Sequence, residues 1–130
     1  MTTRIIMTAS AILLGLTGLS LTFMGDEILS YLGVTSSTTM HLISQLLGAL
    51  YFGFAMMNWM SKTSRIGGIY NRPIVIANLT HFTVGGLALT KEFKHLTAAA
   101  GGLVLLTIVY FILAASFGYL LFKSPVKPVA

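Results

Sequence analysis

The sequence contains no cysteine, three acidic residues and three prolines. The lack of cysteine excludes disulfide bonds, thiolate metal sites, thiol nucleophiles and dithiol redox chemistry. The acids, Asp26, Glu27 and Glu92, lie at the ends of apolar stretches, so none of those stretches contains a carboxylate. Coupled ion transport and Ser-His-Asp hydrolysis both need a carboxylate near the site of chemistry, and the sequence therefore argues against both classes.

What the chain does contain is apolar residues. Of its 130 residues 55% are hydrophobic and 8% are charged, and the mean hydropathy is +0.87. This length suits one domain, but so few polar residues cannot cover a hydrophobic core in water. We therefore expect a protein whose solvent is lipid. The net charge of +5 fits membrane topology better than nucleic-acid binding, because the basic residues lie mainly in loops and tails.

Four apolar stretches are each long enough to cross the roughly 30 Å hydrocarbon core of a bilayer as a helix. They cover about residues 5–24, 40–60, 73–90 and 97–122. A run of Ser and Thr at 35–39 suits a helix start, Pro73 suits a first helical turn, and Pro125 suits a helix end. The sequence thus predicts an all-α fold for a single transmembrane domain, residues 1–130, arranged as an antiparallel up-down-up-down four-helix bundle.

The distribution of basic residues predicts the orientation. If both termini are cytoplasmic, that side carries Arg4, Lys62, Arg65, Arg72, Lys123 and Lys127. The opposite side carries only Lys91 and Lys94, together with the three acids. Because cytoplasmic loops are enriched in Lys and Arg, the sequence predicts an N-in, C-in topology.

Each apolar stretch has one side with small or polar residues and one side with large apolar residues. In a membrane the small side is where helices approach closely and where polar groups find partners. For the 40–60 stretch this predicted inward side consists of His41, Ser44, Gln45, Gly48, Tyr51, Phe52, Ala55, Asn58 and Trp59.

Four polar residues on these sides are candidate ligand-binding residues: Tyr51, Asn58, Asn78 and His81. Tyr51 and His81 are expected at similar depth near the membrane centre, where they could share a hydrogen bond. Asn58 and Asn78 are both nearer the cytoplasmic face and could pair. Two interpretations stay open, because a polar group at this depth forms either a functional site or a structural hydrogen bond between helices.

Metal and haem sites are poorly supported by the same residues. His41 and His95 are not expected at the depth of His81, so the sequence gives little support to ligation of one haem by two histidines. The methionines of the 56–60 segment lie mainly on the predicted lipid-facing side, where methionine serves as adaptable packing. We expect no metal and no cofactor.

The loop between the second and third stretches is the most basic segment of the chain. Lys62, Arg65 and Arg72 surround Gly67, Gly68 and Tyr70 there. Such a cluster can hold an anionic lipid headgroup. The alternative is ordinary anchoring by basic and aromatic residues at the cytoplasmic face.

The pattern as a whole resembles that of small DoxX-like bacterial membrane proteins with four helices. The resemblance rests on a glycine-rich first stretch, an acidic pair followed by LGV, the segment LLGALYFGFAMMNW and the basic loop. It covers the first three stretches and implies a bacterial inner-membrane protein with a role in redox stress or in quinone-linked complexes. The cysteines and charged site of a redox function are missing, so no family residue is transferred to this chain.

Three functions from different classes remain. The sequence favours a non-catalytic accessory or assembly subunit of a larger membrane complex, in contact with a membrane-protein partner or with its own copies. The alternative is a lipid- or quinone-binding bundle with a polar site at mid-membrane, and the third is a membrane enzyme or channel. Few polar residues favour the first and disfavour the third.

Overall fold

The computed structural model describes residues 2–63, 71–92 and 100–123, and within these ranges its elements are all helices. They are α1 (Thr2–Phe23), α2 (Gly25–Tyr31), α3 (Thr38–Ser61), α4 (Arg72–Glu92) and α5 (Ala100–Lys123). α1, α3, α4 and α5 are long and apolar enough to cross a membrane. The all-α class is therefore confirmed, and so are four long apolar helices at the predicted positions, which fit an integral membrane protein.

Local sequence signals explain where three of the helices begin or end. The Ser37 hydroxyl caps α3 by accepting a hydrogen bond from the Met40 backbone N–H at 3.2 Å. Pro73 is the second residue of α4, where its missing N–H costs no helical hydrogen bond. Gly33 follows α2 with φ of 73°, the left-handed conformation that ends a helix most easily when the residue is glycine.

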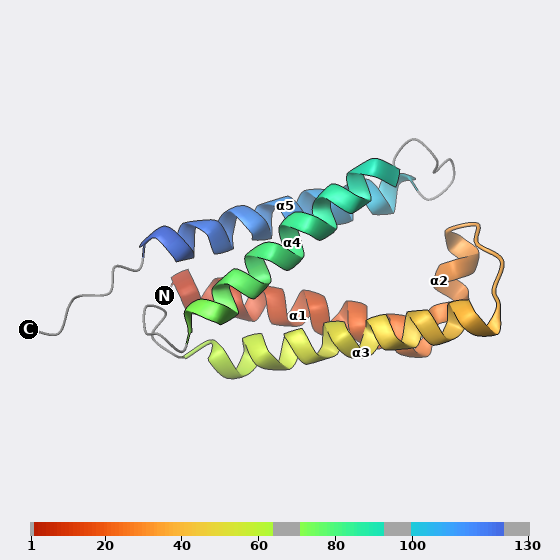
Figure 1. Cartoon of the computed structure of the whole chain (residues 1–130), viewed down its shortest axis with the longest axis horizontal. Coiled ribbons are helices and arrows are strands. Elements are labelled where there is room, and N and C mark those ends of the chain that lie inside the picture. The colour runs from red at the N-terminus through yellow and green to blue at the C-terminus, as the bar shows by residue number, and fades with distance from the viewer. Residues whose placement is uncertain (1, 64–70, 93–99, 124–130) are drawn as a thin grey trace, which may run out of the picture.

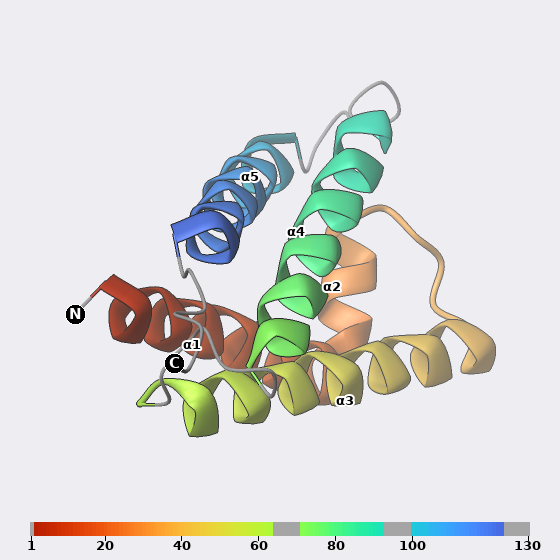
Figure 2. The same cartoon turned by 60° about the vertical axis from the view of Figure 1, so that its left-hand side comes forward.

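α1 packs along α3, and two glycines set how closely the backbones approach (Figures 1 and 2). A Cβ built on Gly18 would lie 2.8 Å from the carbonyl oxygen of Gly48. A Cβ on Gly48 would lie 2.7 Å from the carbonyl oxygen of Gly18. The Ser44 hydroxyl adds a hydrogen bond of 2.9 Å to the Leu21 carbonyl oxygen across the same contact. Close approach at small residues is the usual basis of helix association in lipid.

α4 packs along α5 through aromatic rings rather than through paired glycines. The buried rings of Phe82 and Phe117 stack at a centroid distance of 5.8 Å, and Phe82 meets Tyr110 edge to face at 5.2 Å. Two adjacent glycines of α4 make room for rings of α5: a Cβ on Gly85 would lie 2.7 Å from the Tyr110 ring, and a Cβ on Gly86 would lie 3.3 Å from the Phe111 ring. Offset and edge-to-face ring pairs add to the stability that burial alone provides.

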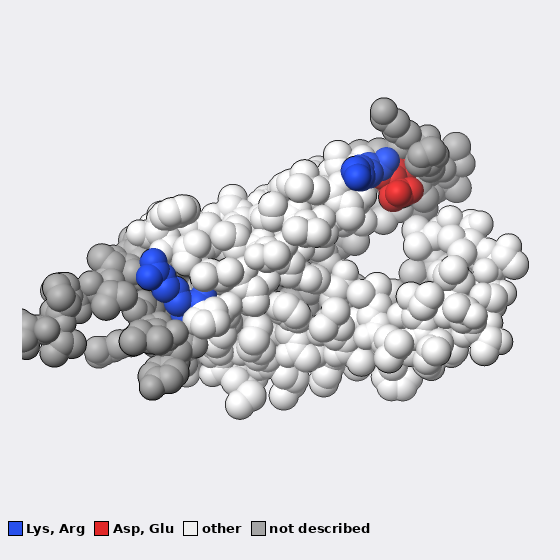
Figure 3. All heavy atoms as spheres, in the orientation of Figure 1, with Lys and Arg blue, Asp and Glu red and all other residues white. Residues whose placement is uncertain are grey.

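The two helix pairs, α1–α3 and α4–α5, meet at one end and diverge toward the other. Figure 1 shows them side by side at the end where α1 and α4 begin, and Figure 2 shows α4 crossing α3 steeply. They share one hydrophobic core, to which the buried Met7, Leu14, Ala55, Val75 and Phe82 contribute. At the other end α2 stands between them, and Figure 3 shows an open notch in the surface there.

This packing differs in part from the sequence prediction. Successive long helices alternate in direction in Figure 1, but they associate two by two instead of converging on one axis. A closed antiparallel bundle therefore stays a prediction. On α3 the inward side is narrower than predicted, with Phe52 42% and Trp59 48% exposed. The reason is that contact through Gly18 and Gly48 brings only a thin line of α3 residues against α1.

Candidate functional site

Three polar side chains join both helix pairs at the end where the pairs meet. We call Ser10, Asn58 and Asn78 the asparagine clasp; all three are fully buried. The amide nitrogen of each asparagine donates to the amide oxygen of the other at 2.7 Å. Asn58 Nδ2 also donates to Ser10 Oγ at 3.0 Å, and Asn78 Nδ2 also donates to the Ile74 carbonyl oxygen at 2.9 Å. The predicted pairing of Asn58 with Asn78 is confirmed.

The clasp has no donor left for a ligand. Each amide has two N–H groups, and each of the four bonds above uses one of them. Ser10 Oγ donates its own proton to the Met7 carbonyl oxygen at 3.0 Å. A buried network in which every donor is paired fixes the helices relative to each other. The ligand-binding role predicted for Asn58 and Asn78 thus gains no support from this geometry.

A second polar contact joins the helix pairs at Tyr51 of α3. Tyr51 lies seven residues before Asn58, which is about 10 Å along the helix axis. The Tyr110 hydroxyl donates to the Tyr51 hydroxyl oxygen at 3.0 Å, and we call these residues the tyrosine pair. Tyr110 is 3% exposed, whereas Tyr51 is half-buried. Sequence reasoning did not recognise Tyr110 as a site residue. The sequence feature that could have identified it is a polar phenol group within the most hydrophobic of the four candidate spans.

His81 lies beside the tyrosine pair in a cage of aromatic rings. Its ring meets Tyr51 edge to face at a centroid distance of 5.2 Å and stacks on Phe54 at 5.1 Å. No hydrogen bond joins Tyr51 to His81, so the bond expected from their shared depth is not formed; Tyr51 pairs with Tyr110 instead. The Nε2 atom of His81 is buried and has no hydrogen-bond partner among the described residues.

The larger of two cavities beside the tyrosine pair has a volume of about 440 Å³, and its lining includes Ile28, Tyr31 and Leu32 at the diverging end. Its walls come from the second half of α1, from α2, and from the first halves of α3 and α5. No lining side chain is charged. Its polar side chains carry hydroxyl groups only, and they are Thr17, Ser20, Tyr31, Tyr51 and Tyr110.

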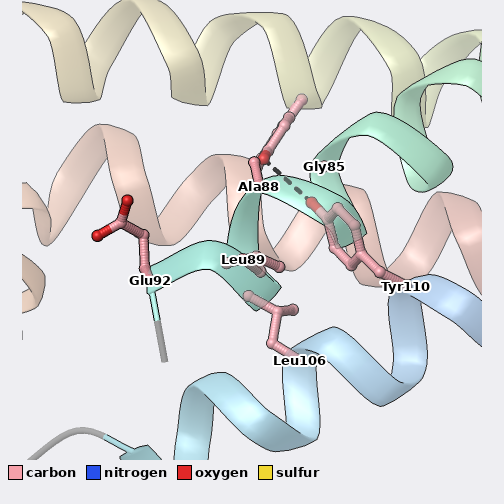
Figure 4. A pocket seen from close by; sticks show the side chains of 7 residues that line it. Gly85, Ala88, Leu89, Glu92, Leu106 and Tyr110 are labelled. Atoms are coloured by element: carbon pink, nitrogen blue, oxygen red, sulfur yellow. Dashed lines mark hydrogen bonds between the residues drawn. The ribbon is translucent and has the colours of Figure 1, made fainter. Parts of the chain in front are cut away.

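The smaller cavity, of about 300 Å³, lies on the α4 side of the tyrosine pair (Figure 4). Gly85, Ala88, Leu89 and Glu92 line it from α4. Both cavities also contact Tyr51, Leu106 and Tyr110, so these side chains form the boundary between them. His81 lines neither cavity. It lies behind the tyrosines, so the predicted site residue that reaches open space is Tyr51.

The basic residues proposed for a lipid headgroup are only partly described. Lys62 Nζ lies 3.0 Å from the centre of the Trp59 ring, a cation–π contact at the end of α3. Arg72 is exposed in the first turn of α4. Arg65 and Tyr70 lie outside the described residues. Figure 3 shows Lys and Arg atoms gathered where α4 begins.

A hydrogen-bonded network fastens α2 to the start of α3 at the other end. Asp26 Oδ1 accepts a hydrogen bond from the Ser36 hydroxyl at 2.6 Å and lies 3.4 Å from His41 Nδ1. The Gln45 amide lies 3.0 Å from the other ring nitrogen of His41. The hydrogen bond from Ser36, with a smaller contribution from the neighbouring His41 ring, holds the pKa of Asp26 below its usual value.

Comparisons with known proteins give no family: no family model, no curated protein and no solved structure matches the chain. The resemblance to DoxX-like proteins therefore stays a prediction from sequence pattern. Within the described ranges no three His, Asp or Glu side chains lie together as a metal site requires. The strongest candidate site in the chain is the pair of cavities beside the tyrosine pair.

Proposed function

We propose that this chain is an integral membrane protein that binds a neutral amphiphile, a lipid or a quinone, in the larger cavity. The observation that carries the proposal is a cavity of about 440 Å³ with an uncharged lining and a phenol pair on its boundary. Ligand sites typically have this size and combine apolar walls with a few placed polar groups. The Tyr51 hydroxyl, which accepts from Tyr110, keeps its own proton for the carbonyl or hydroxyl of a headgroup.

Position within the fold also supports this function. The cavity is lined in part by α2, at the end where the helix pairs diverge, and no residue of the asparagine clasp lines it, so a ligand from the bilayer need not displace the clasp. We further propose that the bilayer holds the four long helices as an antiparallel up-down-up-down bundle. It lies in a bacterial inner membrane with both termini in the cytoplasm, as the basic residues indicate.

Two adjacent glycines allow a matched test of ligand binding. Gly102 lines the larger cavity, and a Cβ there would lie 3.6 Å from the Tyr31 hydroxyl, whereas a Cβ on Gly101 would meet nothing within 4 Å. We expect protein purified in mild detergent to carry lipid or quinone that native mass spectrometry detects. Gly102→Leu should fill the cavity and release the ligand, and Gly101→Leu should retain it. Equal retention in both variants would contradict the proposal.

Orientation can be tested separately, because the chain has no native cysteine. Ser37, the residue before α3, and Thr63, beyond its other end, are exposed. In intact cells Ser37→Cys should react with a membrane-impermeant maleimide, and Thr63→Cys should react only after lysis. The reverse pattern would overturn the N-in, C-in topology.

The accessory-subunit function expected from the sequence is the second candidate. One observation favours it: Gly53 is exposed among large apolar residues of α3, and a Cβ there would meet nothing within 4 Å. Such a notch admits the close approach of a helix from another protein or from a second copy. A stoichiometric protein partner in the same purification, lost in Gly53→Leu, would favour this candidate over ligand binding. Neither candidate is an enzyme.

A further inference from the structure

The smaller cavity differs from the larger one in the charge of its lining. Its lining includes the carboxylate of Glu92, whereas no charged side chain lines the larger cavity. No Lys or Arg lines the smaller cavity, and the described chain gives Glu92 no ion-pair partner. Lys91 is adjacent in sequence, but it is not part of the lining.

Glu92 also lies at a position of α4 where a negative charge is electrostatically unfavourable. It is the last residue of α4, where the terminal carbonyl groups carry partial negative charge. A carboxylate at a helix C-terminus is unfavourable, and a cation there is favourable. The carboxylate and the carbonyl ends therefore make the mouth of this cavity attractive to positive charge.

The inner end of the cavity has a different character. Tyr51, Leu106 and Tyr110 present two phenol rings and an aliphatic side chain, and Figure 4 shows Glu92 at the far end from Tyr110. Tyr110 touches the position of Gly85, and Glu92 lies seven residues later, which is about 10 Å along the axis of α4. A ligand that satisfies both ends has a cation separated from an apolar or aromatic body by a few bonds.

We propose that the smaller cavity is a second site, which binds an amphiphilic amine. Its ammonium group lies at Glu92 near the membrane surface, and its apolar body lies against the tyrosine pair. The tyrosine rings suit the apolar body of such a ligand, because aromatic rings bury a large apolar area and pair with other rings in stacked or edge-to-face arrangements. The site goes beyond the neutral ligand proposed for the larger cavity, and it does not require that ligand to be present.

Three probes of equal length test the charge preference. They are 4-phenylbutylamine, which is a cation near neutral pH, the neutral 4-phenylbutanol, and the anion 4-phenylbutyrate. Binding to the full chain in nanodiscs of neutral phosphatidylcholine is measured by isothermal titration calorimetry. We expect the amine to bind about fivefold more tightly than the alcohol, as one partly exposed ion pair allows, and the butyrate to bind most weakly.

Two variants distinguish the site from partition into lipid. Glu92→Gln keeps the size of the side chain and should abolish the difference between amine and alcohol. Ala88→Phe should fill the cavity from an exposed position of α4 and weaken both probes at least fivefold. Equal binding of amine and alcohol to the unmodified chain, or a preference that survives Glu92→Gln, would overturn the proposal. Loss of this site would leave the Gly102→Leu test of the larger cavity unaffected.

Discussion

The asparagine clasp and the tyrosine pair are two polar contacts between the same helix pairs, and they differ in how completely their hydrogen bonds are used. In the clasp both amides are fully buried and all of their N–H groups are paired. At the tyrosine pair the side chains border two cavities, and the described part of the chain offers no hydrogen-bond partner to the buried Nε2 of the neighbouring His81. A polar residue within an apolar helix can therefore be a purely structural contact or a candidate for ligand binding, and its residue type does not tell which. The number of donors and acceptors that lack a hydrogen-bond partner is the more informative observation.

The largest effect is expected from a substitution that disrupts the packing of α1 against α3, because this helix pair contributes to both the clasp and the tyrosine pair. Gly48→Leu would force a side chain into the backbone of α1 at Gly18, and neither backbone can yield. We expect a loss of about 3 kcal/mol or more, or failure to fold. Gly53→Leu on the same helix meets open space and should change the unfolding midpoint little. Unfolding in mixed micelles of increasing SDS fraction, followed by circular dichroism, measures both.

Breaking the clasp should cost less. Asn78→Ala removes both reciprocal bonds and leaves the amide of Asn58 buried with unused donor and acceptor capacity. A buried unsatisfied group of this kind costs about 1–3 kcal/mol. The same SDS titration should show the shift, and Thr80→Ala, at an exposed position of α4, serves as control. A shift no larger than that of the control would mean that the clasp contributes nothing to stability.

Removing one hydroxyl from the tyrosine pair should have a smaller effect. In Tyr51→Phe the Tyr110 hydroxyl loses its acceptor but still borders the cavities. We expect destabilisation of about 0.5–1 kcal/mol, in the range measured for hydrogen bonds between membrane helices. Retention of copurified lipid or quinone should fall more than stability does. If stability falls and retention does not, the tyrosine pair is architecture like the clasp.

His81→Phe should leave stability unchanged or raise it by about 1 kcal/mol. The substitution keeps an aromatic ring within the cage of Tyr51, Phe54 and Phe82 and removes a buried nitrogen that has no partner. The SDS unfolding midpoint of the variant gives the result. A clear loss of stability would show that His81 makes a bond that the cage does not reveal, as Asn58 and Asn78 do in the clasp.

The smallest effect concerns the network that fastens α2. Because the pKa of Asp26 is lowered in the folded protein, its contribution is present above the unfolded pKa and is lost as the pH falls through the folded pKa. Amide exchange in residues 25–34 should therefore quicken, relative to the intrinsic rate, as the pH falls below the ordinary pKa of an aspartate, about 4. Asp26→Asn should remove this pH dependence. The same segment should be insensitive to pH near neutrality as far as Asp26 is concerned.

The elements of this fold were predictable because lipid imposes simple rules. Length and hydropathy found the four spans, and the Ser/Thr run and Pro73 marked helix starts that the structure confirms. Depth along each span also brought Asn58 and Asn78 together correctly. These predictions succeed because helical rise is constant, so position in the sequence converts directly into depth in the membrane.

Lateral arrangement was harder to predict, and so was the candidate site. Depth placed Tyr51 level with His81. Which side chain forms a hydrogen bond with the Tyr51 hydroxyl depends, however, on how the helix pairs are rotated, and in the structure that side chain is Tyr110 of α5. The periodicity of α3 could not show that Phe52 and Trp59 face outward, because that follows from the close contact at Gly18 and Gly48. The cavities arise from divergence of the pairs, which no single helix encodes.

The position of the clasp near one end of the molecule means that a small change of angle there moves the other end of α4 by a larger distance. The clasp joins the two helix pairs near one end, and Glu92 lies fourteen residues beyond Asn78 on α4. At 1.5 Å per residue this arm is about 21 Å long, so a tilt of about 5° at the clasp displaces its tip by about 2 Å. The phenol contact near the middle of the arm would move only part of that distance. The width of the smaller cavity at its mouth, where Glu92 lies, therefore depends on the angle at which the distant clasp holds α4.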